Sequence, residues 1–166
     1  MRRINMEIKH LSFNLLILFS FIIHTNANAS DCIYNIYVET GNIPYAETSS
    51  NITIFLRDNT KAELPVVNLR NWGLMGSAHH YFRPGEVDLF AGKGPCLRGP
   101  VCSLIIVLDG YDSWYCHSIQ IITVGFGKSC SYKHFVVKKW LDVNAGSAVI
   151  LQDECCYDAI SFKTGY

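Results

Sequence analysis

The segment Asn51–Asp58, with the sequence NITIFLRD, alternates between apolar side chains and mostly polar ones. Ile52, Ile54 and Leu56 fall on one face, and polar residues such as Thr53 fall on the other. Side chains of a β-strand point alternately to the two faces of a sheet, so this period of two predicts a strand with one buried side. The segment therefore indicates a β-sheet protein.

Seven further segments show short apolar patterns separated by turn-forming residues. Many short strands between turn signals predict an antiparallel sandwich or barrel, and no segment shows a long period of 3.6 residues. We expect at most one short helical turn, around Lys139–Val143. The further strands are expected at Ile33–Val38, Ala62–Leu69, Tyr81–Phe90, Val101–Asp109, Trp114–Val124, His134–Trp140 and Ala148–Gln152.

Composition narrows the class of protein. The chain has 166 residues, of which 49% are hydrophobic and 17% charged, and its formal net charge is zero. This length suits one globular domain, and the apolar content excludes a disordered chain. Because nucleic-acid binding needs a cationic surface, neutrality argues against DNA or RNA as the main partner.

The N-terminus has the features of a secretory signal peptide. Basic residues near the start are followed by the apolar stretch Leu11–Ile23 and by Ala27-Asn28-Ala29. The apolar stretch falls short of the roughly 20 residues that span a bilayer, so cleavage after Ala29 is favoured over a membrane anchor. We therefore expect a signal peptide at 1–29, a single exported domain at 30–166, and a secreted or endomembrane-lumenal location.

All seven cysteines fall in the expected exported domain. An oxidising compartment favours disulfides, and the spacing lacks the paired motifs of a zinc site. Cys96 and Cys102 enclose a short turn and could meet at disulfide distance, but the overall connectivity stays open. The odd count leaves a thiol over, so we expect a monomer and keep a covalent dimer as an alternative. The candidates for disulfide bonding are Cys32, Cys96, Cys102, Cys130 and Cys156.

Catalytic motifs are missing from the sequence. There is no Gly-x-Ser-x-Gly elbow, His-Glu-x-x-His helix or P-loop. Cys116 and His117 are adjacent, and on a strand neighbouring side chains point to opposite faces, so they cannot act together as nucleophile and base. The same geometry separates His79 from His80. We therefore expect no catalytic residues and no enzymatic activity.

Four segments together resemble one family. They are WGLMG at 72–76, Tyr81-Phe82, GEVDLFAGKGPCL at 85–97 and CIYNIYVETG at 32–41. This series resembles the small secreted plant PLAT proteins, named for polycystin-1, lipoxygenase and alpha-toxin, whose module is also called the lipoxygenase homology domain. The resemblance covers about Cys32 to Cys156 and implies a disulfide-stabilised, eight-stranded antiparallel β-sandwich of two four-stranded sheets.

The resemblance also implies a non-catalytic binding module. PLAT domains direct attached enzymes or channels to membranes, lipids or protein partners, and here we expect the domain to stand alone. The leading hypothesis is binding of a lipid surface or small apolar ligand in plant stress or nodule (symbiotic) physiology, in the endoplasmic reticulum, apoplast or symbiosome. The alternative is a protein-interaction module of the endomembrane lumen that has no affinity for lipid.

The sequence gives little support for a calcium site. Where family members tend to have Ala-Gly-Thr-Asp-Ser, this chain reads AETSS at 46–50, so Ser49 replaces an aspartate ligand. Calcium takes six to eight oxygen ligands, and we therefore expect no bound cofactor. If calcium does bind, the candidate ligands are Glu86 and Asp88, which share a strand face, together with Asp109 and Asp112.

Two surface features complete the expectations. Trp72, Leu74 and Met75 lie in a loop that contains Gly73 and Gly76, and they are candidate contacts with a membrane or apolar ligand, since indole prefers the membrane boundary. The alternative is a loop folded back to cap the sandwich. Asn51-Ile52-Thr53 is a sequon, which makes Asn51 a candidate glycosylation site in an exported protein.

Overall fold

The computed structural model describes residues 31–126, 130–142 and 148–152. The expected signal peptide at 1–29 lies outside the described residues, and so do Cys155 and the disulfide candidate Cys156. Within the described ranges, no helix has the length and apolarity needed to cross a membrane.

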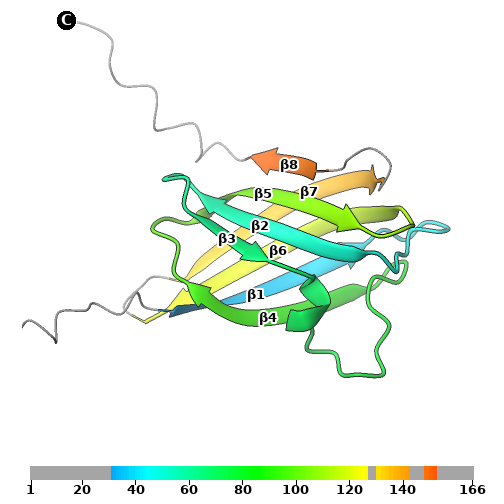
Figure 1. Cartoon of the computed structure of the whole chain (residues 1–166), viewed down its shortest axis with the longest axis horizontal. Coiled ribbons are helices and arrows are strands. Elements are labelled where there is room, and N and C mark those ends of the chain that lie inside the picture. The colour runs from blue at the N-terminus through cyan, green and yellow to red at the C-terminus, as the bar shows by residue number, and fades with distance from the viewer. Residues whose placement is uncertain (1–30, 127–129, 143–147, 153–166) are drawn as a thin grey trace, which may run out of the picture. The chain divides into compact units, whose positions relative to one another are not determined.

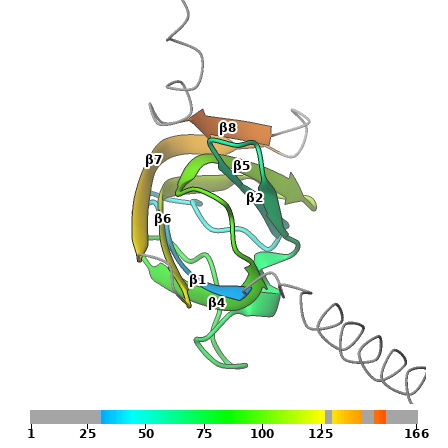
Figure 2. The same ribbon diagram turned by 90° about the vertical axis from the view of Figure 1, so that its left-hand side faces the viewer.

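The strands form two four-stranded sheets (Figure 1). One sheet has the order β4-β1-β6-β7 and the other β3-β2-β5-β8, and the pairings within each are antiparallel. Figure 2 shows the two sheets as separate layers facing each other. This confirms the eight-stranded antiparallel sandwich. The bounds are β1 Asp31–Thr40, β2 Asn51–Asp58, β3 Glu63–Val66, β4 Val87–Pro95, β5 Val101–Asp109, β6 Trp114–Gly125, β7 Ser131–Leu141 and β8 Ala148–Gln152, with a 3₁₀ turn η1 at Leu69–Trp72.

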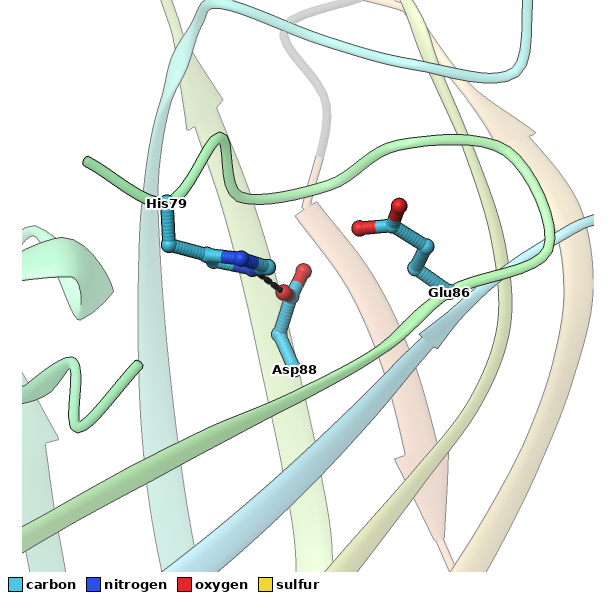
Figure 3. Close-up of side chains that lie close together, drawn as sticks. All are labelled: His79, Glu86 and Asp88. Atoms are coloured by element: carbon cyan, nitrogen blue, oxygen red, sulfur yellow. Dashed lines mark hydrogen bonds and ion pairs between the residues drawn. The ribbon is translucent and has the colours of Figure 1, made fainter. Parts of the chain in front are cut away.

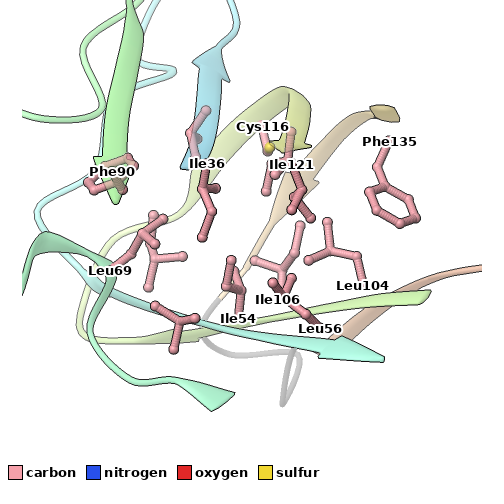
Figure 4. Close-up of a cluster of buried hydrophobic side chains, with 14 of the residues drawn as sticks. Ile36, Ile54, Leu56, Leu69, Phe90, Leu104, Ile106, Cys116, Ile121 and Phe135 are labelled. Carbon is pink, nitrogen blue, oxygen red and sulfur yellow. The ribbon is translucent and has the colours of Figure 1, made fainter. Parts of the chain in front are cut away.

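The core lies between the facing sheets, as the alternation in the sequence predicts (Figure 4). Ile52, Ile54 and Leu56 of β2 are fully buried, whereas Arg57 on the other face is exposed. Removing such side chains from water is the main favourable term in folding, worth about 1.5–3 kcal/mol for each large apolar side chain. The opposite sheet contributes Ile36, Phe90, Cys116, Ile121 and Phe135 to the same cluster.

The strand expected at Tyr81–Phe90 is wrong over its first half, because β4 begins only at Val87. Phe82 and Gly85 have φ angles of 68° and 74°, in the left-handed region, so the backbone turns there instead of extending. The buried carboxylate of Asp88 accepts a hydrogen bond from the backbone N–H of Phe82 and holds this turn. A hydrogen bond to Asp88, which comes later in the sequence, therefore stabilises a turn where the local pattern predicts a strand.

The helical turn expected around Lys139–Val143 is also not found in its described part. Strand β7 runs to Leu141 and stays paired with β6, with a register shift between Cys116 and Ser118. Lys138 has a φ of 47°. A β-bulge accommodates the irregular pattern there by inserting a residue, and the strand continues beyond it.

The cysteine pairing differs from the short-range pair that the sequence suggested. Cys96 bonds to Cys32 and not to Cys102, with a Cα–Cα distance of 4.8 Å, because β1 and β4 are neighbours in one sheet. Cys102 is also disulfide-bonded. Cys130, another disulfide candidate, is instead a free and exposed thiol. Strand pairing across the sheet, and not proximity in sequence, selects the partner of Cys96.

Replacing both Cys32 and Cys96 with alanine will lower the free energy of unfolding by about 2–4 kcal/mol, because this bond restricts a long loop of the unfolded chain. The two cysteines are 64 residues apart in sequence. Urea denaturation of the purified protein measures the change.

The matched control for this experiment is Cys130→Ser, which alters an exposed thiol outside any disulfide. We expect its effect to stay below about 0.5 kcal/mol, as for most surface substitutions. An equal loss in both variants, or no loss in the double variant, would contradict the structural role of the Cys32–Cys96 bond.

Candidate functional site

Three connecting segments gather at one end of the β-sandwich, which we call the loop end. They are residues 41–50 between β1 and β2, residues 67–86 between β3 and β4, and residues 110–113 between β5 and β6. In Figure 1 the first and third of these lie at the same side of the sandwich. Each segment hydrogen-bonds to at least one other, so the loop end is a connected unit.

Asp112 is the acceptor that joins two of these segments. Its carboxylate accepts hydrogen bonds from Thr48 Oγ1 at 2.9 Å, Ser49 N at 2.8 Å and Ser50 N at 3.0 Å. Burial alone would raise the pKa of this carboxyl, but the hydrogen bonds from Ser49, Ser50 and Thr48 outweigh burial and lower the pKa to about 2. Asp112 therefore stays ionised and fixes the 41–50 segment.

Arg70 of η1 ties the third segment to the first. Its Nη1 donates to the carbonyl of Ser50 at 2.7 Å, and its Nη2 donates to the carbonyl of Thr48 at 3.0 Å. The guanidinium also lies over the ring of Phe82, 4.8 Å from the ring centroid, in a cation–π contact. Burial lowers the pKa of Arg70, while the nearby charges of Asp112 and Asp88 favour the protonated form. The side chain of Arg70 therefore links segments of the loop end to one another.

Trp72, Leu74 and Met75, which the sequence analysis treats as one group, differ in how far they are buried. The indole of Trp72 is half-buried, packs against the core and lies on Gly92 of β4, where an added Cβ would come within 2.3 Å of the ring. Leu74 and Met75 are 58% and 44% exposed. The structure therefore folds Trp72 back onto the sandwich and leaves only Leu74 and Met75 at the surface.

Several exposed apolar residues of the loop end were not identified from the sequence. Tyr45 is 83% exposed, Tyr111 is fully exposed, and Ile43 is 38% exposed. Tyr45 also has a φ of 63°, a conformation that a bulky residue rarely adopts, and it precedes the fully buried Ala46. Each lies in a turn between strands, so no apolar period marks it. A tyrosine between Gly41-Asn42 and Ala46, or between Gly110 and Asp112, was the available signal.

The four calcium candidates do not form one site. Glu86 and Asp88 lie close together, as their spacing predicted, and they are joined by His79 (Figure 3). Asp112 is engaged by the hydrogen bonds of the 41–50 segment, and Asp109 belongs to neither group. The sequence does not indicate that His79 joins these carboxylates, because its approach to Asp88 depends on the turn at Phe82 and Gly85.

The His79–Asp88 contact is short and largely buried. Asp88 has no exposed surface, and its Oδ1 lies 2.6 Å from His79 Nε2 while its Oδ2 accepts from the backbone N–H of Phe82 at 2.6 Å. The His79 ring packs edge-on against Tyr81, whose hydroxyl accepts from the backbone N–H of Met75 at 2.9 Å. His79 thus connects the exposed loop to β4.

A cleft of about 550 Å³ opens beside this contact. Its walls include Ser49, Arg70, His79, His80 and Tyr81, so it is lined mainly by polar and aromatic groups. A cleft of this size matches those that hold small ligands, which occupy roughly 300–1,000 Å³. The loop end therefore combines exposed apolar side chains with a polar cleft.

Three other residues singled out in the sequence, Cys116, His117 and Asn51, are not among the residues that line this cleft. Cys116 is a buried free thiol, and burial together with the nearby charge of Glu39 raises its pKa, so it stays protonated. His117 is 4.0 Å from Glu39. Asn51 is exposed at the first residue of β2, so its glycosylation stays a prediction.

Comparison with known proteins gives both a family and a set of structural neighbours. The family model described as Embryo-specific protein 3 (ATS3) matches residues 19–146. PLAT domain-containing protein 2 of Arabidopsis thaliana is 38% identical over 116 residues, which cover 68% of this chain and 63% of that protein. PLAT domain-containing protein 3 of the same plant is 36% identical over 95 residues, covering 54% of this chain and 91% of that protein. The matched region thus spans under two thirds of the first relative.

Solved structures support the fold. The structure of coral 8R-lipoxygenase, described as activated by calcium through a C2-like domain, matches with a TM-score of 0.53 and 21% identity over 72% of this chain and 16% of the enzyme. Clostridium perfringens alpha-toxin matches with a TM-score of 0.53 and 16% identity over 77% of this chain and 33% of the toxin. Only a minor part of each neighbour is matched, so the likeness concerns the β-sandwich alone.

Replacing Asp112 with asparagine will destabilise the protein at neutral pH and much less near pH 2. The lowered pKa of about 2 means that ionised Asp112 stabilises the folded state above the usual carboxyl pKa of 3.8, and this contribution is lost as pH falls toward 2. Urea unfolding at pH 6, 4 and 2 measures the difference between wild type and Asp112→Asn.

Asp109→Asn is the control, because Asp109 is exposed and its carboxylate accepts none of the hydrogen bonds that hold the 41–50 segment to Asp112. Its effect on the free energy of unfolding should stay small across this pH range. A deficit of Asp112→Asn that is independent of pH would show that the carboxylate charge does not hold the loop end.

Proposed function

The chain belongs to the family of PLAT domain-containing proteins, and from this premise we propose that it is a non-catalytic binding module that docks on a lipid surface through its loop end. The proposal rests on one observation. Large apolar side chains that the core does not need are exposed together at this end of the sandwich. They include Ile43, Tyr45, Leu74, Met75 and Tyr111.

These side chains have the chemistry of a membrane-contacting rim. Leucine, isoleucine and methionine transfer favourably from water to the acyl boundary, and tyrosine is enriched at the membrane–water interface. Single exposed apolar residues are ordinary on protein surfaces, whereas a group gathered at one end indicates an interaction site. The residues project from three different connecting segments, so their gathering is a property of the fold.

The loop end is also held in place before any ligand arrives. Asp112 and Arg70 fix the 41–50 segment, and Trp72 packs on Gly92 directly before the exposed Leu74. Binding by a rigid surface loses less conformational entropy than binding by loops that must first be ordered. The polar anchors therefore support the display of the apolar rim.

A second candidate function, docking of a protein partner, is favoured by a different surface. The outer face of the β4-β1-β6-β7 sheet exposes Ile33, Val124, Tyr132 and Val136, at 44%, 44%, 61% and 54%. Ile33 and Val124 are paired neighbours on β1 and β6. An apolar sheet face of this kind suits a protein interface better than a membrane, because it lacks protruding loops.

Export from the cytosol forms part of the proposal. The Cys32–Cys96 disulfide supports a protein that matures in an oxidising compartment, such as the endoplasmic reticulum, the apoplast or a symbiosome. We assign the binding module to plant stress or symbiotic physiology on the resemblance described above.

Serine substitution of Leu74 and Met75 together will weaken binding to liposomes by about tenfold or more, because each buried apolar side chain contributes on the order of 1.5 kcal/mol. Flotation of the purified protein with liposomes of neutral and anionic phospholipid measures the bound fraction. We expect the wild-type protein to float.

The matched control is Tyr132→Ser with Val136→Ser, which removes two exposed apolar side chains from the outer sheet face. Flotation of this variant should equal that of the wild type. If the wild-type protein does not float, or if the control loses binding equally, lipid docking through the loop end is wrong. The protein-docking alternative then becomes the better explanation.

A further inference from the structure

One carboxylate oxygen of Glu86, a partly buried residue, is not explained by the lipid-docking proposal. Its Oε2 atom is buried and has no hydrogen-bond partner among the described residues. A polar oxygen left unpaired in the interior destabilises the folded state, so such groups usually have a ligand or a structural partner. The backbone of Glu86 is fixed at the start of β4 by two hydrogen bonds, with Thr40 and Arg83, so the side chain is held near this position.

Two further ligand atoms converge on the same place. One ligand atom each from His79, Glu86 and Asp88 lies within 4.8 Å of the others. Figure 3 shows the His79 ring and the Glu86 carboxylate on either side of the Asp88 carboxylate. The two carboxylates carry more negative charge than the nearby guanidinium of Arg70 balances, and a divalent cation between them would compensate the remainder.

We propose that His79, Glu86 and Asp88 bind a zinc-type divalent cation. Imidazole nitrogen with two carboxylate oxygens is a ligand set used by zinc and other first-row transition ions, whereas calcium prefers six to eight oxygens and no nitrogen. The site is separate from the exposed apolar rim and does not depend on lipid binding.

The geometry needs only small movements to receive the ion. Metal–ligand distances of about 2.0–2.2 Å place neighbouring ligand atoms somewhat over 3 Å apart. His79 Nε2 and Asp88 Oδ1, now 2.6 Å apart, would separate slightly, and Glu86 would move inward. The side chain of His79 is 22% exposed and lines the polar cleft, which gives the ion an entry path and leaves room for a water ligand.

Binding would also tie two parts of the loop end together. His79 belongs to the segment between η1 and β4 that carries Leu74 and Met75, whereas Glu86 directly precedes β4 and Asp88 lies within it. Asp88 already receives the backbone N–H of Phe82, which orients its second oxygen as outer-shell partners do in metal sites. The cation would therefore fix the exposed loop against the sandwich.

Cobalt(II) titration of the purified protein in a Cys130→Ser background tests this proposal, because cobalt replaces zinc and reports its ligands by visible absorption. We expect saturable binding of one ion that zinc displaces, without the near-ultraviolet band of a thiolate ligand. Removing Cys130 takes away the exposed free thiol, which could itself bind the ion.

Glu86→Gln and His79→Ala should each weaken cobalt binding by at least about tenfold, as loss of a metal-site residue does. His80→Ala, at the exposed neighbouring residue, is the matched control and should bind as the parent does. Glu86→Gln keeps the shape of the side chain. It therefore tests the metal site on its own if circular dichroism shows that His79→Ala does not fold. Absence of saturable binding, a thiolate band, equal binding by Glu86→Gln, or displacement by calcium as effective as by zinc would overturn the proposal.

Discussion

The packing of two apolar sheet faces against each other is the interaction on which the rest of this molecule depends. β2 and β5 pair within one layer and β1 and β6 within the other, and their inner side chains form one continuous core. Because strands alternate their side chains, this packing fixes which residues face outward. It also brings strand ends from distant parts of the chain together, so that the connecting segments meet at the two ends of the sandwich.

Aspartate carboxylates stabilise these ends where backbone pairing stops. Asp112 collects the N–H and hydroxyl groups of Ser49 and Ser50 at the loop end. Asp58, which is 2% exposed, accepts from the backbone N–H groups of Ala62, Arg98 and others at the opposite end. Burial would raise the pKa of Asp58, but hydrogen bonds from Thr60, Gly99 and Ala62 lower it. Because ionised acceptors hold the turns, the exposed tips can carry large apolar side chains that do not contribute to the core.

The proposed binding surface could be predicted only in part from the sequence. Leu74 and Met75 were recognisable because they lie between glycines, but Trp72 was grouped with them although its ring packs on Gly92. Neither Tyr45 nor Tyr111 belongs to a periodic pattern, so their exposure depended on the turns that present them. Glu86 and Asp88 share a strand face by their spacing, whereas the approach of His79 depends on the turn at Phe82 and Gly85.

The pattern of residues alone is enough to predict the class of fold, since the period of two along segments such as Asn51–Asp58 leaves a one-sided sheet as the arrangement that buries its apolar residues. The family resemblance can also be read from the residues. Three features became clear only once the sheets were packed: the bond between Cys32 and Cys96, the start of β4 at Val87, and the set of loop residues that meet. These features depend on contacts between residues that lie far apart in the chain, such as Cys32 with Cys96 or Thr48 with Asp112. Local sequence patterns hold no information about such contacts until the sheets are packed.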